Sequence, residues 1–177
     1  MDTSHNVSQK DLDLCKKFFN YVYESFQSKQ KTFNFELTEC GINSVSKLTN
    51  NNTKPQALHN PIDQLGFNGQ NCSLAKLALD TPEGKSRVVV MILSSKLNDY
   101  AMQFADELKS DNARIMVLGV GPKVDLKQME GIATSSLYAL KVPKFEYLRH
   151  MAQTVRNFIG QGRMKSKHPF FFYIKHH

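Results

Sequence analysis

The sequence predicts an α/β protein in which helices cover both faces of a mostly parallel sheet, and three observations support this. Arg87–Leu93 and Ala113–Gly121 are continuous apolar runs rich in β-branched residues, as expected of strands buried on both faces. Asn98–Ser110, between them, has the spacing of an amphipathic helix. A helix that joins two buried strands forms a crossover, which makes the strands parallel. The predicted architecture is a three-layer α/β/α, doubly wound, Rossmann-like fold.

The N-terminal part of the chain predicts one helix and two strands. The helix begins at Ser8 or Gln9 and ends at about Gln27, and Ser8 can cap its first turn. Its apolar residues recur every three or four positions and predict a buried face: Leu12, Cys15, Phe18, Phe19, Val22 and Phe26. Thr32–Thr38 alternates as a strand does, and Ile42–Leu48 alternates more weakly, as a short edge strand does.

Short helices and one short strand are predicted before and after the crossover. Ala57–Leu65 and Ser73–Asp80 predict two helices separated by a glycine-containing loop. After the crossover, Asp125 caps a helix that ends at about Ala133, and Ser136–Lys141 predicts a strand.

The C-terminal part predicts one more helix and a tail. Pro143 suits a first helical position, and the helix that it begins runs to Phe158 and ends before Gly160 and Gly162. The tail that follows is basic and contains the apolar run Pro169–Ile174.

Composition limits the class of protein. The chain has 177 residues, 41% of them hydrophobic and 22% charged, which suits one globular domain. Its formal net charge of +7 suits an anionic partner, although a solvated basic surface is the simpler explanation. No apolar run reaches the roughly 20 residues of a membrane-spanning helix.

The cysteines and the glycosylation sequons say little about metal binding, disulfides or secretion. Cys15, Cys40 and Cys72 lack metal-ligand spacing. We expect Cys15 to be a buried thiol, and the disulfide status of the three is left open. Asn-x-Ser/Thr sequons, which are candidate glycosylation sites and argue weakly for secretion, occur at Asn6, Asn51 and Asn71.

The order of elements resembles a von Willebrand factor type A domain. Val88–Ser94 is similar to the fourth strand of that family, and Ile115–Gly121 to its fifth, which typically ends in Gly-Val-Gly. Phe145–Phe158 is similar to its terminal helix. The resemblance covers about residues 2–160 and is closest to the domains of collagen VI chains, matrilins and similar matrix proteins.

The first strand of the family is central in its sheet and directly precedes the aspartate of its metal motif. Here only Met1 precedes Asp2. The resemblance therefore implies a domain over residues 1–160 that lacks this strand, followed by a basic and aromatic tail over 161–177, whose disorder is left open. We expect either a truncated form of a longer protein or another segment in the empty position. Pro169–Ile174 is the apolar run left to fill it, between the second and fourth strands of the family.

The resemblance also implies a metal-ion-dependent adhesion site, in which oxygen ligands hold Mg²⁺ and leave one position open for a partner's carboxylate. The first motif of that site aligns with Asp2, Ser4 and Asn6, its threonine with Gln70, and its second aspartate with Ser94. With the second carboxylate gone, we expect weak or absent Mg²⁺ binding and no other cofactor. In the alternative, Asp2 and Ser4 only form turn and cap hydrogen bonds.

No catalytic arrangement is recognisable, so we expect no enzymatic activity. The resemblance implies a noncatalytic adhesion module that is secreted as part of a longer matrix protein and binds matrix proteins or glycans rather than nucleic acid. Binding is expected at the loops beyond the carboxyl ends of the strands. The candidate residues there are Phe67, Asn68, Gln70, Ser94 and Ser95.

Two alternatives remain open. One is an intracellular scaffold of the same fold that binds an acidic protein or nucleic acid. The other is a truncated fragment without a function of its own. The oligomeric state is not predicted.

Overall fold

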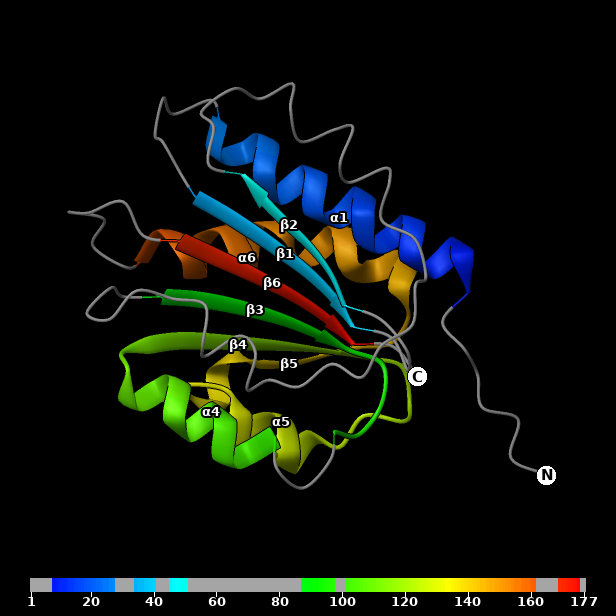
Figure 1. The fold of residues 1–177 in the computed structure, drawn as a ribbon. Helices are drawn as coiled ribbons and strands as arrows, with labels where there is room; N and C mark the ends of the chain where they lie inside the picture. Colours follow the sequence, from blue (N-terminus) through cyan, green and yellow to red (C-terminus); the bar gives the residue numbers. More distant parts are fainter. Residues whose placement is uncertain are drawn as a thin grey trace.

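The structure, a computed structural model, describes residues 8–27, 34–40, 45–50, 87–97, 101–161 and 169–175. Its strands are β1 (Asn34–Cys40), β2 (Val45–Asn50), β3 (Arg87–Leu93), β4 (Ala113–Val120), β5 (Ala139–Val142) and β6 (Pro169–Lys175). They form one sheet in the order β2-β1-β6-β3-β4-β5 (Figure 1). All neighbouring strands are parallel except β2, which runs antiparallel to β1 at the edge of the sheet.

Helices cover both faces of this sheet. They are α1 (Gln9–Gln27), α4 (Ala101–Ser110), α5 (Leu126–Ile132) and α6 (Leu148–Gln161), with short 3₁₀ helices η1 (Ser136–Tyr138) and η2 (Phe145–Tyr147). α1 and α6 pack on one face, and α4 and α5 pack on the other (Figure 1). The predicted three-layer, doubly wound architecture is confirmed.

Burial on both faces explains the continuous apolar run of β3. Val88, Val90 and Ile92 belong to the core beneath α1 and α6. Their neighbours in the chain belong to the core beneath α4 and α5: Val89, Met91 and Leu93. Because successive residues of a strand point to opposite faces, every position from 88 to 93 has to be apolar.

The position of β6 corrects one expectation about the C-terminal tail. Pro169–Lys175 is a strand of the sheet, whereas the resemblance placed it outside the domain. β6 pairs with β1 on one side and β3 on the other, so that Phe171 is in register with Glu36 and Val89. This is the place expected for a replacement of the family's central strand.

Several predicted boundaries also shift. The predicted strand at Ser136 begins as η1, and its paired part, β5, starts at Ala139. α6 continues through Gly160 to Gln161, because glycine weakens a helix without ending it. The predicted helices Ala57–Leu65 and Ser73–Asp80 lie outside the described residues.

Arg114, near the start of β4, holds the end of α6 against the sheet. Its Nη2 donates to the carbonyl oxygen of Phe158 at 2.9 Å, and its guanidinium lies 4.5 Å from the centroid of the Phe158 ring. The contact supplies a partner to a carbonyl in the last turn of the helix, where carbonyls lack helical partners. It links the start of β4 to the end of α6.

The two glycines of the Gly-Val-Gly sequence are required for different structural reasons. A Cβ on Gly119 would collide with Sδ of Met129, so this glycine allows α5 to pack closely on β4. Gly121 has φ +87°, in the left-handed region, and its amide donates to the carbonyl oxygen of Val142 at 2.9 Å. One glycine therefore serves packing, and the other serves the turn that follows β4.

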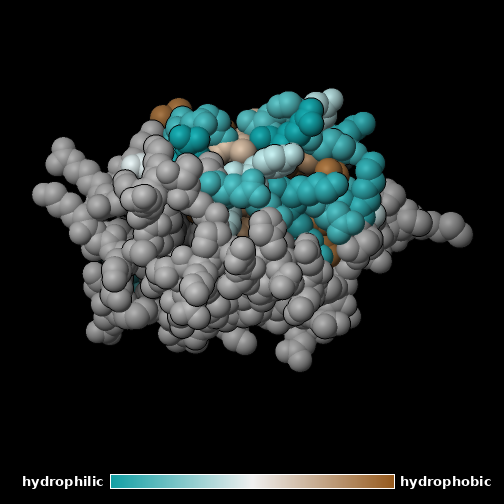
Figure 2. Space-filling view, turned by 90° about the horizontal axis from the view of Figure 1, so that it is seen from above, coloured by the Kyte–Doolittle hydropathy of each residue, from teal (hydrophilic) through white to brown (hydrophobic). Residues whose placement is uncertain are grey.

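The outer surface carries few hydrophobic side chains where it is described. In Figure 2, which looks down from above the view of Figure 1, the coloured residues of this face are mostly hydrophilic, with a few hydrophobic residues among them. No helix in the described segments is long and apolar enough to cross a membrane.

The turn at Gly121 makes a testable difference to stability. Nothing lies within 4 Å of a Cβ added there, so Gly121→Ala causes no clash with neighbouring atoms. It is unfavourable only because alanine rarely adopts the positive φ of this position. We expect the substitution to lower the free energy of unfolding by about 1–2 kcal/mol in urea denaturation.

Gly160→Ala is the matched control, because a Cβ there also meets nothing within 4 Å but the residue is helical. We expect it to be neutral or to raise the free energy of unfolding by up to about 1 kcal/mol. Equal effects of the two substitutions would contradict the backbone explanation.

Candidate functional site

The parallel strands bring their carboxyl ends to one edge of the sheet. We use the term carboxyl edge for the segments that follow β3, β4 and β5 together with the last residue of β6: Ser94–Leu97, Gly121–Asp125, Pro143–Tyr147 and Lys175. Figure 1 shows the arrowheads of β1, β6 and β3 side by side. Open α/β sheets bind ligands at this edge, so it is the candidate site of the described chain.

Ser94 and Ser95 lie at this edge directly after β3, and both are half-buried. Oγ of Ser95 is 3.5 Å from the carbonyl oxygen of Lys96, at the limit of hydrogen bonding. The hydroxyls provide neutral donors and acceptors here, without a carboxylate.

A glutamine of α5 holds the segment after β3 in place. The amide of Leu97 donates to Oε1 of Gln128 at 2.7 Å, and Nε2 of Gln128 donates to the carbonyl oxygen of Leu97 at 3.1 Å. Gln128 is itself positioned by its backbone amide, which donates to Oδ1 of Asp125 at 3.3 Å. Both polar backbone groups of Leu97 are thus paired, so the segment has a defined conformation.

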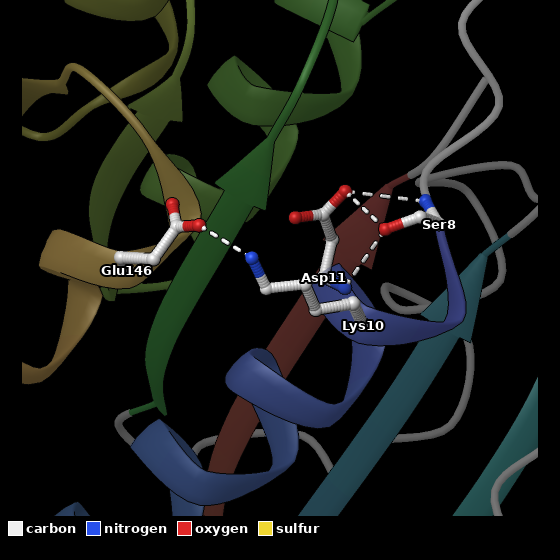
Figure 3. Close-up of polar contacts among 4 residues, drawn as sticks. All are labelled: Ser8, Lys10, Asp11 and Glu146. Atoms are coloured by element: carbon white, nitrogen blue, oxygen red, sulfur yellow. Dashed lines mark hydrogen bonds and ion pairs between the residues drawn. The ribbon is translucent and has the colours of Figure 1, made fainter.

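The start of α1 is tied to the same edge (Figure 3). Ser8 and Asp11 form a reciprocal cap, in which the amide of each residue donates to the side chain of the other at 3.2 Å. This confirms Ser8 as the cap. Nζ of Lys10 lies 3.1 Å from Oε1 of Glu146 in η2, which links α1 to the segment after β5.

The pKa of Glu146 lies below its usual range. A hydrogen bond from its own backbone amide is the largest cause, and the hydrogen bond from Lys10 is the next. Both favour the charged carboxylate. The ion pair is exposed, so it orients the two segments more than it stabilises the fold.

The described residues of the carboxyl edge do not fit the metal site that the family resemblance implies. That site needs a carboxylate after β3, and Ser94 stands there instead. No group of three or more His, Cys, Asp or Glu side chains within the described segments is arranged to hold a metal ion. A hard divalent cation takes oxygen ligands, mainly carboxylates, so we derive no function through a bound metal.

Ser94 and Ser95 are the predicted site residues that the structure describes. The other candidates lie outside the described residues: Asp2, Ser4, Asn6, Phe67, Asn68 and Gln70, as do the sequons at Asn6, Asn51 and Asn71. Cys15 is a buried thiol in the core, as expected, and the side chains of Cys40 and Cys72 are not described. Gln128, Lys10 and Glu146 were not predicted as site residues.

Comparisons with known proteins agree with the fold. The sequence model of the von Willebrand factor type A domain matches residues 1–154. A comparison with curated proteins finds no match.

Three solved structures of proximal thread matrix protein 1 from the mussel byssus are similar in fold. Their TM-scores are 0.68, 0.71 and 0.71, at 16%, 17% and 18% sequence identity. The third is described with a zinc-occupied MIDAS motif. Each match covers 86% of this chain and 43% of the other, so the chain spans less than half the length of those proteins.

The Gln128 contact predicts a local effect of substitution. Gln128→Ala leaves the amide and carbonyl of Leu97 without their partner, so we expect a loss of about 1–3 kcal/mol in the free energy of unfolding. We also expect faster hydrogen exchange at the Leu97 amide.

Gln103→Ala is the control, because Gln103 is an exposed glutamine of α4 whose hydrogen bond to Glu107 is long, at 3.4 Å. It should change stability by less than about 0.5 kcal/mol. Unchanged protection of Leu97 in Gln128→Ala would show that the contact does not hold the segment.

The Lys10–Glu146 pair predicts a shift that an NMR titration of the Glu146 carboxyl group can follow. Lys10→Ala should raise the pKa of Glu146 only part of the way to its ordinary value, because the larger contribution from its own amide remains. Because the folded pKa is lowered, the stabilisation is present above the ordinary pKa of glutamate and is lost as pH falls through the folded pKa.

Lys17→Ala, which removes an exposed lysine from the same helix, serves as the control. It should leave the titration of Glu146 unchanged. A similar shift in both variants would assign the effect to net charge rather than to the pair.

Proposed function

Because the chain belongs to the von Willebrand factor type A family, we propose that it is a noncatalytic protein-binding module of an extracellular matrix protein. The family match over residues 1–154 supports the class of module. The similar structures come from a thread matrix protein of the mussel byssus, which supports a matrix setting. The role is like that of the domains of collagen VI chains, with other matrix proteins or glycans as partners.

The observation that most supports this proposal is that Gln128 holds the segment after β3 in place at the carboxyl edge. Gln128 pairs with both polar backbone groups of Leu97, so the segment after β3 is ordered before any partner binds. An ordered loop costs less conformational entropy on binding than a flexible one. The edge therefore suits recognition of a protein surface.

The metal site is degenerate in this proposal. Ser94 replaces the carboxylate expected after β3, and Asp2, Ser4 and Asn6 remain as the candidate ligands, with too little negative charge for tight binding of Mg²⁺. Secretion as part of a longer protein and glycosylation at Asn6, Asn51 or Asn71 belong to the same proposal.

Binding to matrix components tests the proposal. We expect saturable binding to immobilised fibrillar collagen or to a related matrix protein, measured by surface plasmon resonance and unchanged by EDTA. No binding to any of a panel of purified matrix proteins and sulfated glycans would contradict it.

Isothermal titration with Mg²⁺ tests the degenerate site separately. We expect no saturable heat at micromolar Mg²⁺. Micromolar binding that Asp2→Ala abolishes would overturn this part of the proposal while leaving the binding role intact.

A further inference from the structure

The carboxyl edge is rich in lysine. Each of the three segments that follow β3, β4 and β5 contributes one exposed lysine: Lys96, Lys123 and Lys144. The last residue of β6 is also a lysine, Lys175. Lys175 is in register with Leu93 on β3 and with Cys40 on β1. This register places a lysine at the middle of the edge, beside the point where β3 leads into Ser94.

The two acidic residues of the carboxyl edge are already used within the chain. Asp125 accepts a hydrogen bond from the amide of Gln128 at 3.3 Å and caps α5. Glu146 accepts from Lys10 at 3.1 Å. Within the described residues, the edge therefore has an excess of positive charge, which attracts anions.

This charge pattern is opposite to that of a site built for a divalent cation. A cation site concentrates carboxylates at its centre, whereas here a lysine and two serines lie at the centre of the edge. An ammonium group forms charge-assisted hydrogen bonds with a carboxylate directly. The lysines can thus supply the positive charge that a metal ion would otherwise supply.

We propose that the carboxyl edge binds a carboxylate-rich segment of a partner protein directly through Lys123 and Lys175, without a bridging divalent cation. This inference rests on the proposed binding function and specifies the chemistry of the partner.

Exposed apolar residues favour an acidic peptide over a sulfated glycan. Leu126, next to the segment after β4, is 44% exposed, and Tyr147, in the segment after β5, is 49% exposed. Lysines spaced singly among apolar side chains and serine hydroxyls suit a peptide that mixes acidic and apolar residues. A uniformly anionic polysaccharide would be better matched by a continuous run of basic residues.

Fluorescence anisotropy with a labelled peptide of alternating glutamate and leucine tests the proposal on the full chain. We expect saturable binding in the presence of EDTA, weakening as salt increases. Lys123→Gln/Lys175→Gln should weaken binding roughly tenfold, as expected for the loss of two ion pairs with the peptide. Lys17→Gln/Lys47→Gln is the matched control, because it removes the same charge from α1 and from the middle of β2.

Three outcomes would overturn the proposal. Equal weakening by the two double variants would assign binding to net charge, and loss of binding in EDTA would assign it to a metal. Tighter binding of heparin than of the peptide, lost in the Lys123→Gln/Lys175→Gln variant, would assign the edge to sulfated glycans. If the chain binds the acidic peptide but none of the matrix proteins in the panel, the proposed matrix function is wrong and the inferred peptide site still stands.

Discussion

Strand β6 forms backbone ladders with β1 on one side and β3 on the other. In the described sheet these two ladders join the pair β2–β1 to the three strands β3–β4–β5. Without them, β1 and β3 would each present a row of unpaired amides and carbonyls, which proteins avoid at the centre of a sheet. The packing of α1 and α6 across one continuous face also depends on this join.

The same join determines the chemistry at the carboxyl edge. Because β6 is parallel to both neighbours, its last residue, Lys175, reaches the edge at the level of Leu93. The segment after β3 is held beside it by Gln128, and the start of α1 is tied to η2 by Lys10 and Glu146. A strand that comes late in the chain thus places a positive residue where the family uses carboxylates and a metal ion.

Much of the fold could be predicted because its signals are local. Buried strands show as apolar runs, and α1 and α6 show as stripes of three-and-four spacing. The position of β6 was harder, because the aromatic run Pro169–Ile174 has no periodicity that identifies its neighbours, and strand pairing is a long-range property. The family resemblance even drew the domain boundary ahead of it, at residue 160.

The site was less predictable than the fold. Ser94 and Ser95 were found because they follow a recognisable strand. The spacing of Asp125 and Gln128 is that of a capping box, which predicts that the glutamine returns to the cap. In the structure its side chain bonds Leu97 instead, because the segment after β3 lies beside α5. Such contacts depend on how the helices and strands pack in space, and this packing cannot be deduced from the spacing of residues along the chain.

Hydrogen exchange at the amides of β6 tests the central place of this strand most directly. We expect the amides of Phe171 and Tyr173 to exchange as slowly as the amide of Val117 in β4, because all three lie in interior strands of one sheet. Exchange of Phe171 and Tyr173 at the rate of an unstructured peptide, with Val117 still protected, would contradict the account.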